Sequence, residues 1–402
     1  MRRRWATTVL LVGALALLVG AAAAVAQAPL GGKGAKASTV KVGIIYSRTG
    51  PLSAYGAEYI QGLKLGLDYV TKGTGTVAGK KIEFMVVDDA GDPAKAVSAA
   101  KDLIGQGYKI IAGTEVSGVA LQLGPLAEQN RVLYISGPAA NDGITGLNKY
   151  TFRSGRQTYQ DVVTADSFLG GQVGKKIVVF AQDSAFGQGN VATVKAVLGG
   201  KGHTVSGILV PSSATEFTPF AQQVKQANPD LLFVAWAGTT ASAMWKALDQ
   251  QGVFDVSNKI VTGLAERATW QTFGDPATKI QFLSHYVWTG PKTKPNDWLV
   301  AKMRARNQAP DLFTPDGFVA AQMIARAIQQ SGGDDVDKMV SALEGWKFLA
   351  PKGMQTIRKS DHAMLQPMFQ VRLVKKGSRL VPQVLATVPP EKTAPPEKPI
   401  SG

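Results

Sequence analysis

Short apolar runs alternate along the chain with segments in which apolar residues recur at helical spacing. The runs begin near residues 41, 81, 109 and 131, and a second series begins near residues 176, 204, 230 and 259. Continuous apolar runs of this length are typical of parallel strands that helices cover on both faces. The two series therefore predict an α/β protein with two Rossmann-like lobes, each built on a mainly parallel sheet.

The last part of the chain departs from this alternation. A predicted strand at 281–288 precedes three helical patterns, and two strand-like runs follow at 368–374 and 380–386. This order predicts that the chain returns to both lobes. Lobe 1 is expected to comprise residues 39–157 and 288–360, and lobe 2 residues 158–287 and 361–388. The Pro-rich segment 389–402 is expected to be a disordered tail.

The first 28 residues have the composition of a secretory signal peptide. Arg2, Arg3 and Arg4 precede an apolar run at 9–25, and Ala26-Gln27-Ala28 supplies the small-residue cleavage site. An uncleaved membrane anchor is the alternative, but the run is short and rich in Ala, whereas a membrane span needs ~20 strongly apolar residues. The chain has no Cys, which excludes disulfides, thiolate metal sites and a lipid anchor on Cys. We therefore expect a mature protein located in the periplasm.

The charge and the motifs favour neither nucleic-acid binding nor catalysis. The net charge of +15 is spread thinly, without the basic stripe and interleaved aromatic residues that nucleic-acid binding needs. No group of residues has metal-ligand spacing, and there is no Gly-x-Ser-x-Gly nucleophile motif. The segment Gly187-x-Gly189-x-x-Ala192 fits a dinucleotide fingerprint loosely. However, residues 183–186 separate it from the preceding strand, and the next strand ends at Leu209-Val210 without the ribose-binding acid. We expect no catalytic residue, no metal and no cofactor.

Two strand-to-helix turns provide the candidate binding chemistry. Residues 109–118 and 132–141 each place small residues and hydroxyl groups directly after an apolar strand. Ligands bind at the carboxyl ends of strands in open α/β sheets, and the free N–H groups of a helix start attract anions. These turns are predicted to hold a carboxylate, and Ser117, where the helical pattern starts, is predicted to be a helix N-cap.

Several stretches resemble one family of binding proteins. They are residues 42–45, 50–56, 88–93, 109–118, 132–141 and 183–189. In order and spacing, these stretches are similar to the leucine-binding-protein-like substrate-binding proteins of branched-chain amino acid-type ABC transporters. The resemblance runs from Thr39 to Ala386. It implies the type I periplasmic binding protein fold, in which three crossover strands join two lobes that close on a ligand.

The resemblance also implies the roles of individual residues. An amino acid's carboxylate would be bound by lobe 1, its ammonium group would meet an acid in lobe 2, and aromatic residues of lobe 2 would cover its side chain. The ligand-binding residues implied in this way are Tyr55, Thr114, Ser117, Ser136, Ala139, Ala140, Phe186, Trp236, Thr239 and Glu266.

Four of these residues depart from the family pattern. Ala140 stands where the family has a hydroxyl, Phe186 where it has Tyr, and Thr239 where it has an aromatic residue. The acid Glu266 is displaced by one position. A more apolar site of this kind widens the expected ligands from amino acids to amides and aromatic carboxylates.

The predicted function is that of a monomeric periplasmic protein that delivers such a ligand to a membrane ABC permease. Two alternatives remain at this stage. One is a ligand sensor that presents its closed state to a membrane receptor. The other is an exported NAD-dependent enzyme, which the broken dinucleotide fingerprint disfavours.

Overall fold

The computed structural model describes residues 38–263, 265–273 and 275–400, so the predicted signal peptide lies outside the described residues. A six-stranded sheet forms the first lobe, in the order β2-β3-β1-β4-β5-β6. Its strands are β1 (Thr39–Tyr46), β2 (Thr76–Val77), β3 (Lys80–Asp88), β4 (Ile110–Ala112), β5 (Leu133–Ser136) and β6 (Thr151–Arg153). All pairs are parallel except β2 with β3, as the apolar runs predict.

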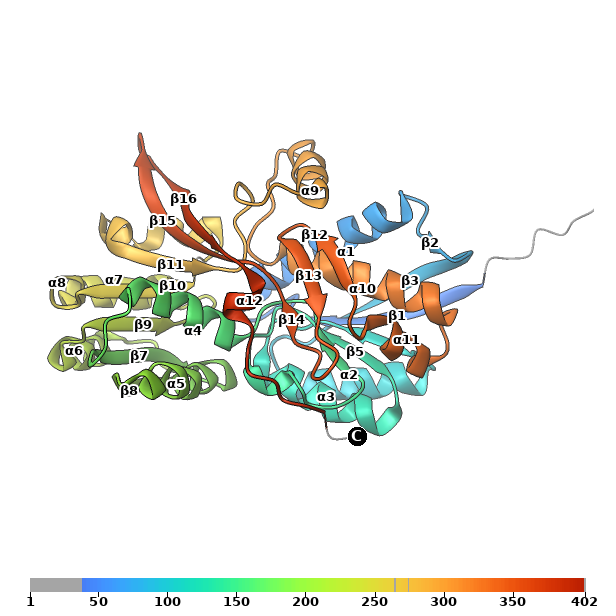
Figure 1. Cartoon of the computed structure of the whole chain (residues 1–402), viewed down its shortest axis with the longest axis horizontal. Helices are drawn as coiled ribbons and strands as arrows, with labels where there is room; N and C mark the ends of the chain where they lie inside the picture. Colours follow the sequence, from blue (N-terminus) through green and yellow to red (C-terminus); the bar gives the residue numbers. More distant parts are fainter. Residues whose placement is uncertain (1–37, 264, 274, 401–402) are drawn as a thin grey trace, which may run out of the picture. The chain divides into compact units, whose positions relative to one another are not determined.

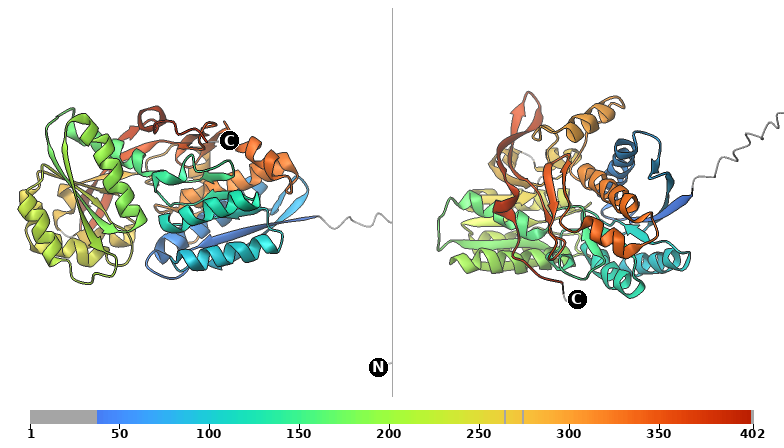
Figure 2. Two further views of the ribbon diagram at one scale, coloured as in Figure 1. Left: turned by 90° about the horizontal axis from the view of Figure 1, so that it is seen from below. Right: turned by 45° about the vertical axis from the view of Figure 1, so that its right-hand side comes forward.

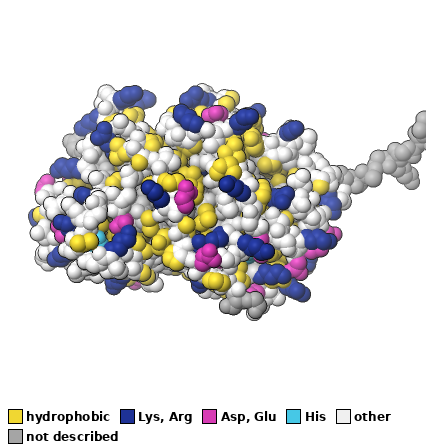
Figure 3. All heavy atoms as spheres, in the orientation of Figure 1, with side chains coloured by type: hydrophobic (Ala, Val, Ile, Leu, Met, Phe, Trp, Pro, Cys, Tyr) yellow, Lys and Arg dark blue, Asp and Glu magenta, His cyan; other side chains and the backbone are white. Residues whose placement is uncertain are grey.

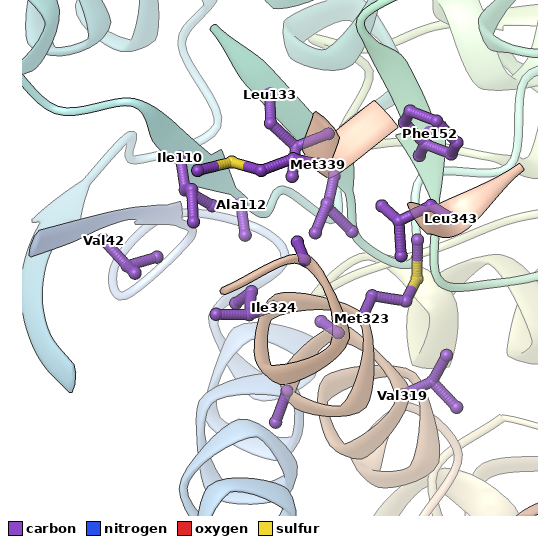
Figure 4. Close-up of a cluster of buried hydrophobic side chains, with 14 of the residues drawn as sticks. Val42, Ile110, Ala112, Leu133, Phe152, Val319, Met323, Ile324, Met339 and Leu343 are labelled. Atoms are coloured by element: carbon purple, nitrogen blue, oxygen red, sulfur yellow. The ribbon is translucent and has the colours of Figure 1, made fainter. Parts of the chain in front are cut away.

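Helices cover both faces of this sheet (Figure 1). One face packs on α1 (Ser53–Thr71), α10 (Thr314–Ser331) and α11 (Val336–Leu343), and the other on α2 (Pro93–Gly105) and α3 (Ser117–Asn130). Side chains alternate along β1, so Val42 and Ile44 join the first core and Ile45 joins the second. Figure 4 shows the first core, where Val42 faces Ile324 of α10.

A seven-stranded sheet forms the second lobe, in the order β16-β15-β11-β10-β9-β7-β8. Its strands are β7 (Lys176–Asp183), β8 (Thr204–Pro211), β9 (Leu231–Ala235), β10 (Lys259–Gly263), β11 (Ile280–Ser284), β15 (Met368–Lys376) and β16 (Arg379–Val388). The five strands β7 to β11 are parallel, with β8 at one edge of the sheet, and β15 and β16 add an antiparallel pair at the other edge. The predicted fold class, with two mainly parallel sheets, is confirmed.

Helices also cover the second sheet, as two further directions of view show (Figure 2). Cores form against α4 (Thr158–Asp166) and α5 (Ala185–Val197) on one face. The other face packs on α6 (Thr218–Ala227), α7 (Ala241–Gln250) and α8 (Val253–Val256). None of the described helices in residues 38–400 is both long and apolar enough to span a membrane.

The chain passes between the two large sheets after β6, after β11 and after a small third sheet. That sheet consists of β12 (Lys347–Ala350), β13 (Gly353–Ile357) and β14 (Met364–Leu365), and α9 (Lys294–Arg304) precedes α10. The segments 154–157 and 285–293 at the first two crossings are irregular rather than extended strands. The predicted strand at 281–288 therefore ends early, at Ser284. The predicted lobe boundaries stay predictions.

The expectation of a disordered tail is wrong for residues 389–400. The chain forms a short helix, α12 (Pro390–Thr393), and then runs along the loop before β14. Arg358 Nη1 donates to the Pro395 carbonyl at 2.8 Å, and the amide of Ile400 donates to the Ser360 carbonyl at 3.0 Å. Proline lacks an N–H, so a Pro-rich segment forms no ladder of its own and its carbonyls accept bonds from elsewhere.

Candidate functional site

A cavity of about 530 Å³ lies between the two large sheets, at the carboxyl ends of their parallel strands. On the first side its walls come from the segments that follow β1, β3, β4, β5 and β6, and on the second side from those that end or follow β7 to β11. Backbone groups at the carboxyl ends of the parallel strands lie at this edge of each sheet. Ligands of open α/β sheets bind at this edge. We call this cavity the cleft.

The start of α3 forms one wall of the cleft. Ser117 lines it, but Val116 is the N-cap residue and no side chain caps the helix. The prediction that Ser117 is the N-cap is therefore wrong, because Val116 has the extended conformation of a cap and Ser117 is already helical. The Oγ of Ser117 accepts a bond from the Asn141 amide at 3.3 Å. A helix start without a side-chain cap keeps backbone donors for an anion.

Two buried acidic residues, Asp89 and Glu115, support this wall through hydrogen bonds. Asp89 accepts bonds from Ser47 Oγ (2.7 Å) and from the Gly91 amide (2.8 Å), and Thr114 Oγ1 also donates to it. Glu115 Oε2 accepts from the Ser47 amide at 2.8 Å. The loops after β1, β3 and β4 are thereby tied together. Thr114 is fully buried and does not line the cleft, so its observed contact is with Asp89 rather than with the cavity.

Glu115 lines the cleft and is 7 % exposed. Its pKa is raised to about 8; burial is the main cause, the nearby Asp89 adds to the rise, and the bond from Ser47 offsets part of it. At neutral pH the carboxyl is mainly protonated, so it adds little negative charge beside the start of α3.

The turn after β5 contributes fewer residues to the cleft than the resemblance implies. Pro138 and Ala140 line it, whereas Ser136 and Ala139 are fully buried beneath the surface. The carbonyl of Ala139 accepts from Arg153 Nη2 at 2.8 Å, which holds this turn against β6. Ser136 and Ala139 thus shape the turn from inside.

Aromatic residues of the second lobe form the opposite wall. Phe186 lies in the first turn of α5, which Ser184 caps by accepting from the Gly187 amide at 3.2 Å. Trp236 follows β9, stacks on Phe180 with 5.5 Å between ring centroids, and donates from Nε1 to Thr240 Oγ1 at 3.0 Å. Phe186, Trp236 and Thr239 all line the cleft. The structure therefore brings these three predicted residues together opposite Ser117.

Glu266, the predicted ammonium partner, does not line the cleft. It borders a smaller neighbouring pocket that Tyr55 and Trp236 share. Burial raises its pKa, and the nearby Asp311 raises it further. Tyr55 lines both pockets and packs edge-on against Phe313, with ring centroids 4.6 Å apart. The ring of Tyr55 therefore lies at the boundary between Glu266 and the cleft.

Sequence reasoning missed other cleft residues. Arg156 follows β6, and its position after a strand end is a signal that the sequence does contain. Leu312 and Phe313 precede α10, far along the chain, and only tertiary packing places them here. Gln182 and Asn190 also line the cleft from the second lobe. Within the described ranges, no cluster of three or more His, Cys, Asp or Glu residues could hold a metal ion.

Comparison with known proteins places the chain in a family. Residues 39–378 match the model of the periplasmic binding protein family. The chain is 26% identical to a Leu/Ile/Val-binding protein homologue of Brucella melitensis, over 80% of this chain and 87% of the relative. It is 33% identical to a crystallised ABC-type branched-chain amino acid transporter protein of Rhodopseudomonas palustris, with a TM-score of 0.74 and coverage of 90% and 100%.

A second solved structure also resembles the chain, with a lower sequence identity and a higher TM-score. It is a solute-binding protein of an ABC transporter from Rhodopseudomonas palustris in complex with 3,4-dihydroxybenzoic acid. The identity is 26%, the TM-score is 0.78, and the match covers 87% of this chain and 97% of that one. The resemblance noted from the sequence is confirmed. This chain belongs to the periplasmic binding protein family, with the type I fold.

Proposed function

We propose that this protein is the solute-binding component of an ABC transporter, works in the periplasm as a monomer and delivers its ligand to a membrane permease. The ligand is a small carboxylate or amide, such as a branched-chain or other amino acid or an aromatic acid. The observation that carries the proposal is the cleft itself, because the strand ends of both sheets contribute to one cavity. A solute there contacts both lobes at once, and such contacts stabilise a closed form.

The two walls of the cleft support this ligand class. The start of α3 offers backbone donors for a carboxylate, and Phe186, Trp236, Tyr55 and Phe313 offer apolar surface for a branched or aromatic group. The names of the relatives cover the same range, from Leu, Ile and Val to 3,4-dihydroxybenzoic acid. Glu266 lies in the neighbouring pocket, so the proposal rests on recognition of the carboxylate rather than of an ammonium group.

Ligand binding can be tested by thermal unfolding. Purified protein lacking residues 1–28 is heated with each member of a panel of branched-chain amino acids, aromatic acids and their amides. A true ligand stabilises the folded state by RT ln(1 + [L]/Kd), about 2.7 kcal/mol at a hundredfold excess over Kd. Phe186→Ala is expected to abolish most of the shift. The absence of any shift across the panel would contradict the proposal.

A further inference from the structure

Arg156 provides the cleft with a permanent positive charge. It follows β6 at the first crossing between the sheets and lines the cleft. Its side chain is 11% exposed, while the residues on either side of it, Gly155 and Gln157, are buried. The accessible part of the Arg156 side chain therefore lies at the cleft. No other Lys or Arg is present among the described residues that line this cavity.

Three neighbours hold the guanidinium in place. Nη1 donates to the Pro138 carbonyl at 2.9 Å, and Nε lies 3.2 Å from Asp161 Oδ2. The group also lies over the ring of Phe313, 5.8 Å from its centroid. These contacts fix the plane of the guanidinium. They involve its Nε and Nη1 sides only.

The other terminal nitrogen of Arg156, Nη2, has N–H donors that can bind a ligand. A guanidinium carries five N–H donors, two of them on each terminal nitrogen. Nη2 of Arg156 has no hydrogen-bond partner among the residues that the structure describes, and Nε, although it lies 3.2 Å from Asp161 Oδ2, is buried without a hydrogen bond. A carboxylate accepts such donors in a charge-assisted bond, whereas an amide oxygen accepts them without a charge of its own. Arg156 can therefore distinguish a carboxylate from its amide.

The other acidic groups of the cleft leave Nη2 of Arg156 accessible to an anion. Asp161 pairs with Arg156 on its Nε side and offsets part of its charge there, and burial raises the pKa of the Asp161 carboxyl. Glu115 has its pKa raised to about 8 and is mainly protonated at pH 7. Asp183 is exposed and accepts from Gln188 Nε2 at 2.7 Å. Arg156 contacts Pro138, so it lies on the same side of the cleft as the start of α3, and both features favour an anion.

We propose that Arg156 is a specificity-determining residue that binds the solute's carboxylate through Nη2 and selects the acid over the corresponding primary amide. This inference rests on the proposed function, because it concerns the ligand of the same cleft. The competing role for Arg156 is that of a brace between Pro138 and Asp161, which would affect every ligand to the same extent.

The test compares acid and amide pairs in isothermal titrations at pH 7. The pairs are benzoate with benzamide, 4-methylpentanoate with 4-methylpentanamide, and leucine with leucinamide. For the pair that binds, the wild type is expected to prefer the acid at least tenfold. Arg156→Gln is expected to weaken acid binding ten- to a hundredfold while amide binding changes less than threefold. Arg156→Lys, which keeps the charge but not the planar fork, should lie between them.

Asp161→Asn is the matched control, because it removes the brace partner and leaves the guanidinium. It is expected to keep the preference for the acid. If Arg156→Gln weakens acid and amide by the same factor, or if the wild type binds both equally, the inference is wrong and the proposed function stands. If Arg156→Gln does not fold, the other two variants decide. The inference is overturned if Arg156→Lys keeps the wild-type ratio of acid affinity to amide affinity and Asp161→Asn loses the preference for the acid. If the wild type binds no member of any pair or of the wider panel, the proposed function fails first.

Discussion

The side-chain amide of Asn141 donates a hydrogen bond to the backbone carbonyl of Ala185, with 2.6 Å between the two atoms. Asn141 follows β5 in the first lobe, and Ala185 begins α5 in the second. A Cβ atom at Gly189, one turn into α5, would lie 2.6 Å from the same Asn141 nitrogen. Because Gly189 has no side chain, Asn141 of the first lobe has room to reach the Ala185 carbonyl of the second.

Gly189→Ala is expected to weaken ligand binding about three- to tenfold, since it displaces Asn141 and with it a contact worth on the order of 1 kcal/mol. Alanine favours a helix over glycine by ~1 kcal/mol, so the melting temperature should not fall much. Titration calorimetry on the best ligand measures the effect. Gly105→Ala is the control, because its Cβ would meet nothing within 4 Å. Equal affinity in both variants would contradict the role of Gly189.

Lys352 and Asp316 form an ion pair with both side chains fully buried. Lys352 Nζ also donates to Gln366 Oε1 at 2.8 Å. Lys352→Met leaves the Asp316 carboxylate buried without this cation, and we expect a loss of about 3–5 kcal/mol in the free energy of unfolding. The double variant Lys352→Met/Asp316→Asn should recover part of that loss. Urea denaturation provides the measurement.

The exposed pair of Lys149 and Asp337 is the control for this prediction. Solvent screens its charges, so Lys149→Met should change the stability very little. A similar small effect for Lys352→Met would show that water reaches the buried pair.

The stability is expected to depend on pH through Glu115. Its folded-state pKa of about 8 lies above the ~4.3 of an unfolded Glu. The contribution of this group to stability is therefore fully present below the unfolded pKa and is lost as the pH rises to about 8. Glu115→Gln removes the titration and keeps an acceptor for the Ser47 amide.

Urea denaturation at pH 5, 6, 7, 8 and 9 tests this expectation. The stability of the wild type should fall relative to Glu115→Gln by at most about 1.4 kcal/mol per pH unit between the two pKa values. Above pH 8 to 9 the difference should level off. Parallel curves for the two proteins across the whole range would refute a raised pKa.

Arg358 is expected to hold the C-terminal tail. Its guanidinium donates to the Pro395 carbonyl and pairs with Asp361, which in turn accepts from the Lys398 amide at 3.2 Å. In Arg358→Gln the amides of Lys398 and Ile400 should exchange faster with deuterium, because their partners lose their support. Mass spectrometry of C-terminal peptides measures the rate.

Arg372→Gln is the control for the tail, because Arg372 is exposed on β15 and bonds to Gln383. It should leave the exchange of the tail unchanged. If the tail of the wild type exchanges as fast as an unstructured peptide, the hydrogen bonds to Arg358, Ser360 and Asp361 do not hold it in solution.

The charged side chains of this protein act through local contacts rather than through a continuous surface patch of one sign. Lys and Arg side chains are scattered over the face in Figure 3, with Asp and Glu between them. The charged groups with structural consequences are instead buried ones, such as Lys352, Asp316 and Arg156. The partner of Lys352 lies 36 residues away along the chain, and that of Arg156 lies in the following helix, so composition does not reveal these pairs.

The elements that the sequence predicted well are those with their own repeating pattern. The run at 81–88 is β3, and Asp92-Pro93 caps and begins α2 as expected, with the Ala94 amide donating to Asp92 at 2.8 Å. The short strands β6 and β12 to β14 were missed, because two to five residues carry too little pattern. The tail was misjudged because its partners lie on another segment.

The sequence alone determined the two-sheet α/β fold, the family and the turns that form the wall around Ser117, because periodic apolar runs and strand-end residues are local properties. Tertiary structure alone decided which side chains reach the cleft. It buried Thr114, Ser136 and Ala139, placed Glu266 behind Tyr55, and brought Arg156 and Phe313 to one surface. Exposure and contact depend on residues far away in the chain, so no local pattern specifies them.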